Sequence, residues 1–266
     1  MQTSRFFTAV GYQEISPALD KLSRAGMHLE VEILDPHWIL EVCQLPVVQK
    51  LGNNLKEKGF RVHVQGPFFD LAPGSLDPYI REHTRDLYVR AAEVAGNLRS
   101  EYLTLYTGYN PLFHAGVFEQ WLELCLPVWR DTIETAQRHK LTVLFSNMFE
   151  EGPEVQLRLI ASFPDKPVGA CLNIPHAFCN SKKKGQSWIG ALASSLRLFH
   201  LYDTRGREDQ RLAVGEGDLP FREFIEPVMK RKLKPDFVFK LPLEQALESL
   251  KTVRKLGLEQ YQMELL

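Results

Sequence analysis

The stretch VGACLNIPHAFCNSKKKGQSWIGALASSLRLFHLYD, residues 168–203, contains the structural unit from which the whole fold is predicted. It begins with a short apolar run at 168–174, continues through a longer segment with helical periodicity, and ends with a second apolar run at 197–203. Short apolar runs of this kind are typical of buried strands, and parallel neighbouring strands need a crossover, usually a helix. The stretch therefore predicts one strand–helix–strand unit.

The same pattern recurs along the chain at intervals of about thirty residues. Helical periodicity is clearest at 77–98 and 243–256. Strict alternation of strand and helix implies parallel strands joined by right-handed crossovers. The predicted strands are residues 6–12, 28–33, 61–67, 102–108, 141–147, 168–174, 197–203 and 236–242, and the predicted helix starts lie at Pro17, Pro36, Pro78 and Pro153.

Eight such units fit either a (β/α)8 barrel, the TIM barrel, or a doubly wound sheet. A nucleotide-binding doubly wound sheet usually carries Gly-x-Gly-x-x-Gly after its first strand, and the sequence has no such motif there. The length of 266 residues suits a barrel, which typically needs about 250. Because no linker or low-complexity stretch divides the chain, we expect one α/β TIM-barrel domain over residues 1–266.

The composition indicates a folded protein and argues against several other classes. A hydrophobic fraction of 44% with 24% charged residues indicates a folded chain with one large core. A net charge of −1 argues against nucleic-acid binding by bulk electrostatics. No apolar run reaches the roughly 18 residues of a membrane helix, and the first residues lack the apolar core of a signal peptide.

The cysteines point to the same class of protein. Cys43, Cys125, Cys171 and Cys179 show no CxxC spacing, so we expect reduced thiols that are mostly buried. Together with the composition, this predicts a soluble cytoplasmic protein without nucleic-acid or membrane partners.

Functional residues of a TIM barrel lie at the C-terminal ends of its strands. This rule selects a short set of polar side chains, to which the loop after the seventh strand adds three more. The set is Gln65, Tyr106, Ser146, Asn147, Asn173, His176, His200, Tyr202, Asp203 and Lys240, with Asp209, Arg211 and Glu216 from the loop.

Four motifs at these strand ends resemble those of the xylose isomerase-like family, which includes sugar phosphate isomerases/epimerases and AP endonuclease family 2. VQGPF (64–68) resembles its His-Gly-Pro turn, and FSNMF (145–149) resembles its Glu-Asn turn. CLNIPHAF (171–178) is similar to Leu-Asp-x-x-His-Ala-Phe. HLYD (200–203) with DQRLAVGEG (209–217) is similar to His-Leu-x-Asp followed by Asp-x-His-Leu-x-Leu-Gly-Glu-Gly. The resemblance implies a TIM barrel with a ligand site at these ends.

The resemblance also implies a metal centre, but most of its ligand positions carry other residues. Gln65, Tyr106 and Arg211 stand where histidines are implied, Ser146, Asn173 and Lys240 stand where carboxylates are implied, and His176, His200 and Asp209 remain. Neutral amide and hydroxyl oxygens are weak ligands for a divalent cation. A cationic side chain about 4 Å away would repel a unit charge by about 4 kcal/mol at an effective dielectric near 20. We therefore expect no metal and no other cofactor.

The same substitutions remove the acid/base pair that the resemblance implies for an epimerase, so that mechanism does not transfer to this chain. The catalytic candidates are His176, His200 and Lys240, with each histidine either a general base or held in a structural hydrogen bond. Lys240 has three interpretations: an ion pair with Asp209 or Glu216, a cation that binds ligand oxygens, or a Schiff-base amine. The predicted ligand-binding residues are Gln65, Tyr106, Ser146, Asn173, Asp209, Arg211 and Glu216.

Three further side-chain roles are predicted from local pattern. Asp203 is expected to anchor its loop by accepting backbone N–H bonds, and Asn147 to shape its own turn by an Asx-type bond. The run Lys182–Lys184 is either a solvated loop or a lid that attracts an anion.

The sequence thus favours a metal-independent sugar isomerase/epimerase-like barrel that binds a small polyhydroxy or phosphorylated ligand. The second hypothesis is a catalytically inactive pseudoenzyme that acts as a binding or scaffolding partner. The third is a metal-dependent isomerase or nuclease with unusual ligands. Turnover, ligand identity and homo-oligomer formation stay open.

Overall fold

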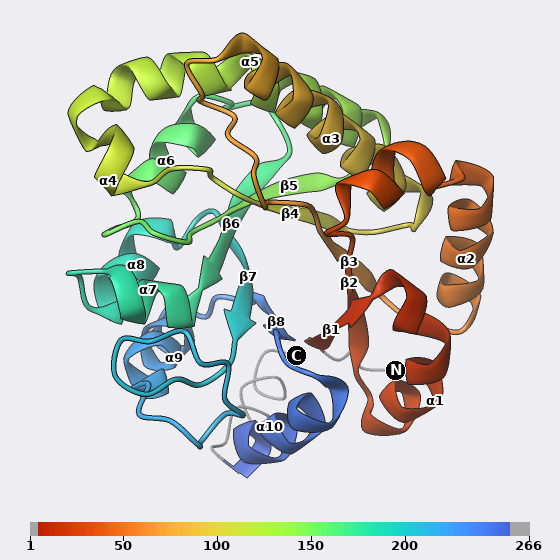
Figure 1. Ribbon diagram of the computed structural model, residues 1–266. Helices are drawn as coiled ribbons and strands as arrows, with labels where there is room; N and C mark the ends of the chain where they lie inside the picture. Colours follow the sequence, from red (N-terminus) through yellow and green to blue (C-terminus); the bar gives the residue numbers. More distant parts are fainter. Residues whose placement is uncertain (1–4, 256–266) are drawn as a thin grey trace. The chain divides into compact units, whose positions relative to one another are not determined.

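The computed structural model describes residues 5–255 (Figure 1). Its strands follow one another around a closed barrel in the order β1 to β8, and the pairs that they form are parallel. The TIM barrel is therefore confirmed over the doubly wound sheet. The strands are β1 (Phe6–Gly11), β2 (His28–Glu32), β3 (Val62–Gln65), β4 (Tyr102–Tyr106), β5 (Thr142–Ser146), β6 (Val168–Asn173), β7 (Leu196–Leu201) and β8 (Asp236–Phe239).

Helices separate successive strands, as the alternation predicts. The α-helices are α1 (Ile15–Ala25), α2 (Leu45–Glu57), α3 (Pro78–Asn97), α4 (Pro111–His114), α5 (Phe118–Arg138), α6 (Glu154–Ala161), α7 (Ile174–Asn180), α8 (Gly185–Leu192), α9 (Phe221–Lys230) and α10 (Leu243–Lys255). Short turns of 3₁₀ or π helix are η1 (Tyr12–Glu14), η2 (Trp38–Val42) and η3 (Ala115–Val117).

The predicted helix starts have mixed outcomes. The start at Pro78 is confirmed, because Asp77 caps α3 by accepting a hydrogen bond from the backbone N–H of Tyr79 at 2.8 Å. Helix α1 already begins at Ile15, two residues before Pro17. The predicted end of the last helix, Leu256, lies outside the described residues.

The chain divides into two compact units. The first takes its described residues from the ranges Met1–Glu30, Asn147–Pro153 and Ala170–Leu266. The second takes them from Val31–Ser146 and Glu154–Gly169. The single domain over residues 1–266 stays a prediction.

Strand register sorts the side chains of the first unit onto two faces. Phe6 pairs in register with Phe237, and Phe199 packs on Phe237 with ring centroids 5.5 Å apart, so one face is aromatic. His200 lies opposite Val238 and Asn173 in register, which places these residues on the other face. Side chains alternate along a strand, so Lys240 belongs to the same face as Val238.

In the second unit, aromatic packing fixes the face that meets the helices. Phe145 on β5 makes an edge-on contact with Trp129 of α5, with ring centroids 5.0 Å apart. Trp129 in turn stacks on Tyr88 of α3 at 5.1 Å. Ser146, the next residue on β5, therefore points to the opposite face, where it lies beside Tyr106 in register.

Two simpler expectations can be compared with residues 5–255. Among their helices there is none whose length and apolarity would suffice to span a lipid bilayer. The cysteines are free thiols, with Cys43, Cys125 and Cys171 buried and Cys179 partly exposed, as expected.

Candidate functional site

Lys240, directly after β8, forms an ion pair inside the first unit. Its Nζ donates a hydrogen bond to Oε1 of Glu30 at 2.7 Å, and the two side chains are 5% and 0% exposed. A buried ammonium without a partner would cost several kcal/mol, so this contact is what allows Lys240 to be buried. The sequence analysis expected an ion pair with Asp209 or Glu216, whereas the ion pair in the structure is with Glu30 on β2, which that analysis did not name.

The second oxygen of Glu30 binds His200 of β7. His200 Nε2 lies 3.0 Å from Glu30 Oε2, and both side chains are fully buried. Strands β8 and β1 separate β7 from β2, so these side chains meet across the interior face. Because a carboxylate only accepts hydrogen bonds, Nε2 carries the proton that it donates. Glu30, His200 and Lys240 are called the buried triad below.

The triad keeps Glu30 ionised. Burial alone would raise the pKa of this carboxyl, but the charges of His200 and Lys240 and their hydrogen bonds outweigh it. The pKa of Glu30 consequently lies well below its ordinary value of 4.5. The Glu30 carboxylate and the Lys240 ammonium thus form a buried pair of opposite charge.

A second pair of predicted residues meets near the first turn of α7. His176 Nε2 lies 3.5 Å from Oδ2 of Asp209, and His176 Nδ1 lies 3.2 Å from the carbonyl oxygen of Asn147. Asp209 is 44% exposed whereas His176 is 7% exposed. The carboxylate is therefore the part of this pair that solvent or a ligand can reach.

Tyr202 and Arg211 complete the surroundings of Asp209. Hydrogen bonding by His176, aided by Tyr202, holds the pKa of the Asp209 carboxyl below its ordinary value despite partial burial. The guanidinium carbon of Arg211 lies 5.9 Å from the centroid of the Tyr202 ring, within the range of a cation–π contact. His176 of α7 thus meets Tyr202 at the end of β7 and Asp209 and Arg211 in the loop that follows.

Asn147 and Asn173 connect two strand ends. Asn147 Nδ2 donates to the carbonyl oxygen of Asn173 at 3.0 Å, and Asn173 N donates to Asn147 Oδ1 at 2.9 Å. The expectation that Asn147 shapes its own turn was wrong, because its amide bonds to β6 instead. Asn173 Oδ1 also accepts from the backbone N–H of His176 at 3.1 Å, which caps α7 at its first turn.

Asp203 anchors the loop after β7, as predicted. Its carboxylate accepts hydrogen bonds from the backbone N–H groups of Thr204 at 2.8 Å, Gly215 at 2.8 Å and Leu219 at 3.2 Å. Glu216 closes a turn within the same loop, since its Oε2 accepts from Ala213 N at 3.2 Å. These bonds hold the segment that carries Asp209 and Arg211.

The remaining predicted ligand-binding residues lie in the second unit. Gln65 Nε2 donates to the carbonyl oxygens of Gly66 and Thr104, both at 3.2 Å, and the ring of Tyr106 meets Phe68 edge-on at 5.0 Å. Within residues 5–255, the buried atoms Gln65 Oε1 and Ser146 Oγ have no hydrogen-bond partner. Native proteins usually satisfy such atoms with ordered water or a ligand.

The lysine run lies between α7 and α8. Lys182 forms an ion pair with Glu151 at 2.7 Å, and Ser181 Oγ accepts from Lys183 N at 2.8 Å. Both contacts fit a loop tied to its neighbours. A lid function for this run stays a prediction.

The first-unit residues fit a divalent metal poorly at the strand ends. At the end of β8 the side chain is the ammonium of Lys240, and the carboxylate that it reaches, Glu30, is already bound by two donors. The Asn173 Oδ1 atom caps α7. Carboxylates that could bind a metal also occur at the starts of strands, but each forms an ion pair with an arginine. Glu101 pairs with Arg61 at 2.7 Å, and Asp236 pairs with Arg5 at 3.1 Å.

Comparison with known proteins identifies the family. Residues 12–256 match the model of the xylose isomerase-like TIM barrel. Protein MJ1311 of Methanocaldococcus jannaschii is 26% identical over 172 residues, which cover 61% of this chain and span 58% of that relative's length.

Solved structures share the fold of this chain. The TTHB071 protein from Thermus thermophilus, soaked with ZnCl2, has 23% identity and a TM-score of 0.78, covering 96% of this chain and 98% of its own. A D-tagatose 3-epimerase-like protein has 20% identity and a TM-score of 0.79, covering 98% and 99%. Identities this low support the shared fold alone.

Proposed function

Because the chain belongs to the xylose isomerase-like TIM-barrel family, we propose that it binds a small polyhydroxy or phosphorylated ligand at the ends of β6, β7 and β8 without a divalent metal. The observation that carries this proposal is the Lys240 ammonium, fixed at 2.7 Å from Glu30 at the end of β8. A fixed cation there supplies the positive charge that attracts a ligand oxygen.

Lys240 is the member of the buried triad with exposed surface, at 5%, whereas Glu30 and His200 have none. It is therefore the group that meets the ligand, and the other two are positioning residues. Its ion pair with Glu30 favours the charged amine, whereas a Schiff base forms from the neutral amine. Hydrogen bonding and charge are accordingly its proposed role, rather than covalent chemistry.

A sugar-like ligand agrees with the polar side chains around the strand ends. Asp209 accepts hydrogen bonds and is 44% exposed, and Arg211 and His176 lie close to it, so hydroxyl groups find both donors and acceptors. One structural relative is named as D-tagatose 3-epimerase-like, which supports the ketose class as a first set of probes.

Isothermal titration calorimetry of the full chain with D-tagatose and with fructose 6-phosphate tests binding. We expect Lys240→Met to weaken binding by about tenfold or more, as loss of a charge-assisted hydrogen bond predicts. Lys230→Met on exposed α9 is the matched control and should bind like the wild type. The double variant Glu30→Gln/Lys240→Met provides a second test without a buried unpaired charge. No binding of either probe, or equal binding by all variants, would contradict the proposal.

A second candidate, a binding protein without turnover, is favoured by the closed state of the triad. Both Glu30 oxygens are occupied, and the Glu30 and His200 side chains are 0% exposed. Proton NMR of the sugar distinguishes the candidates, because an isomerase or epimerase converts its sugar into a second sugar with resonances of its own. A product signal that disappears in Lys240→Met would support an enzyme, and binding without any product signal would support the second candidate.

Metal independence is tested by elemental analysis of dialysed protein. We expect less than about one zinc or manganese per ten chains, because Ser146 and Asn173 offer neutral oxygens, Lys240 is a cation and the Glu30 carboxylate is already bound by two donors. Variants Glu101→Gln and Asp209→Asn locate any metal that is found: loss of the metal in the first places it at a strand start, and loss in the second places it at the strand ends. About one ion per chain that is lost in Asp209→Asn, or metal-dependent incision of abasic DNA, would favour the third hypothesis.

A further inference from the structure

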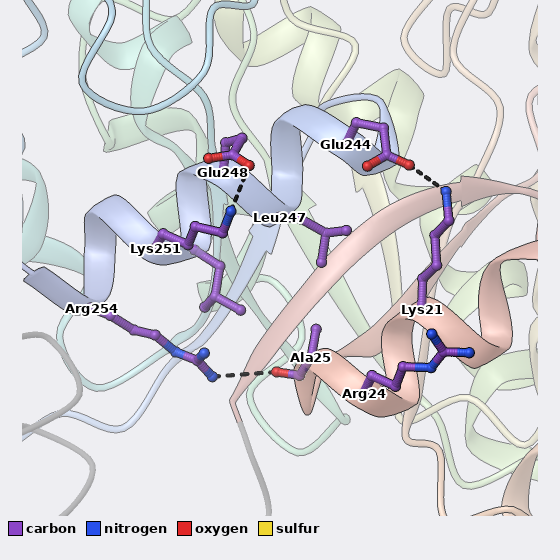
Figure 2. A pocket seen from close by; sticks show the side chains of 9 residues that line it. Lys21, Arg24, Ala25, Glu244, Leu247, Glu248, Lys251 and Arg254 are labelled. Atoms are coloured by element: carbon purple, nitrogen blue, oxygen red, sulfur yellow. Dashed lines mark hydrogen bonds and ion pairs between the residues drawn. The ribbon is translucent and has the colours of Figure 1, made fainter.

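A groove between α1 and α10 lies outside the site described above. It has a volume of about 390 Å³ and is lined by residues of these two helices (Figure 2). Small-molecule sites commonly have volumes of about 300–1,000 Å³, so the groove suits a small ligand. Its apolar part comes from Ala25, Leu247 and Leu250.

The charged lining of the groove is mainly basic. Lys21, Arg24, Lys251 and Arg254 face two carboxylates, Glu244 and Glu248, although the whole chain has a net charge of −1. Each carboxylate is engaged by a lysine: Lys21 pairs with Glu244, and Lys251 pairs with Glu248 at 2.7 Å. The local excess of positive charge therefore rests on the two arginines.

The arginines come from the last turns of the two helices and lie on either side of Ala25 in Figure 2. Arg254 Nη2 donates to the carbonyl oxygen of Ala25 at 3.3 Å. Within residues 5–255, the Arg24 guanidinium has no hydrogen-bond or ion-pair partner. A guanidinium presents a planar fork of donors that matches phosphate oxygens.

Favourable interaction with the helix dipole accounts for one basic residue at each C-terminus, but it does not require a hollow between them. The end of α1 is also already capped, because the Gly26 backbone N–H bonds to the carbonyl oxygens of Leu22 and Ser23. These carbonyls therefore need no cation. Among the groups of residues 5–255, none takes up the donors of Arg24.

We propose that this groove binds a small phosphate-bearing molecule, with Arg24 as the principal anion ligand and Leu247 beneath the non-phosphate part. This site is independent of the proposed ligand site after β8. It would give the chain a second ligand site, at the ends of α1 and α10 rather than at the strand ends.

Isothermal titration calorimetry of the full chain with pyrophosphate, at constant ionic strength, tests the proposal. We expect Arg24→Gln to weaken binding by about tenfold, whereas Arg222→Gln, an exposed arginine on α9, should leave it unchanged. Lys240→Met should also leave it unchanged. No detectable binding, equal weakening by Arg24→Gln and Arg222→Gln, or loss of binding only in Lys240→Met would overturn the proposal, and the last result would assign the phosphate to the site after β8.

Discussion

Glu30 and Lys240 lie 210 positions apart in the sequence, yet their charged groups meet at 2.7 Å in the interior of the first unit. His200 binds the other oxygen of the same carboxylate at 3.0 Å. One acid thus holds two basic side chains. Replacing a single member of such a group is expected to cost more than replacing the pair, since it leaves a buried charge uncompensated.

Glu30→Gln should lower the free energy of unfolding by about 3–5 kcal/mol, because the Lys240 ammonium loses its countercharge while staying buried. Urea denaturation followed by circular dichroism measures this loss. The double variant Glu30→Gln/Lys240→Met should recover most of it. Glu57→Gln, at the exposed end of α2, is the control and should cost less than about 1 kcal/mol. Equal losses in Glu30→Gln and Glu57→Gln would contradict the assigned role.

The depressed pKa of Glu30 predicts an acid-side dependence of stability. In the unfolded chain this carboxyl takes up a proton near pH 4.5, whereas in the folded protein it stays ionised to lower pH. The unfolded state then binds more protons, so stability falls as the pH drops below about 4.5, by up to about 1.4 kcal/mol per pH unit from this group. The slope for Glu30→Gln/Lys240→Met should be smaller by about one proton. Identical slopes for the two proteins would show that Glu30 titrates normally.

The fold was predictable because its signals are local. Alternation in β8 puts Lys240 on the opposite face from Phe239, and its ion pair with Glu30, which also binds His200, agrees. The capping signal Asp77-Pro78 likewise marked the start of α3 correctly. Each of these signals depends on a few adjacent residues, so distant parts of the chain do not alter it.

The partner of Lys240 could not be predicted in the same way. Glu30 lies in the middle of β2, so a search limited to strand ends passed over it. An acid within the apolar run 28–33 was nevertheless a signal, because a buried carboxylate requires a partner. For Asn147 the local prediction failed. We expected its side-chain amide to form a hydrogen bond within its own turn, but it bonds to the backbone of Asn173 on β6 instead.

Thiol reactivity should follow burial. Burial raises the pKa of the Cys125 thiol to about 12, so its thiolate is scarce at pH 8, whereas Cys179 is partly exposed with a less strongly raised pKa. In the native protein, Ellman's reagent should react with Cys179 first and leave Cys125 unmodified. The variant Cys179→Ser should lose this early reaction, and all thiols should react in urea. Rapid labelling of Cys125 in the folded protein, located by peptide mapping, would contradict its burial.

Asp203 is expected to control the order of the loop that carries Asp209 and Arg211. Its buried carboxylate accepts from three backbone N–H groups, so Asp203→Ala would leave buried donors without their acceptor, at about 1–3 kcal/mol for each. The same carboxylate approaches Gly217 so closely that an added Cβ would lie 2.3 Å from its Oδ1, and Gly217→Ala should therefore loosen the loop by a different route.

Hydrogen exchange measured by mass spectrometry tests this role. Peptides from 204–219 should exchange faster in Asp203→Ala and Gly217→Ala, while peptides from α3 should stay unchanged because that helix lies in the other unit. Asp218→Asn is the matched control. Within residues 5–255, the exposed Asp218 carboxylate accepts hydrogen bonds from the backbone N–H of Gly206 alone. Its effect on exchange should be small. If residues 204–219 exchange at the same rate in Asp203→Ala and Asp218→Asn, contacts other than those of Asp203 hold this loop. Asp209 and Arg211 would then be positioned independently of Asp203.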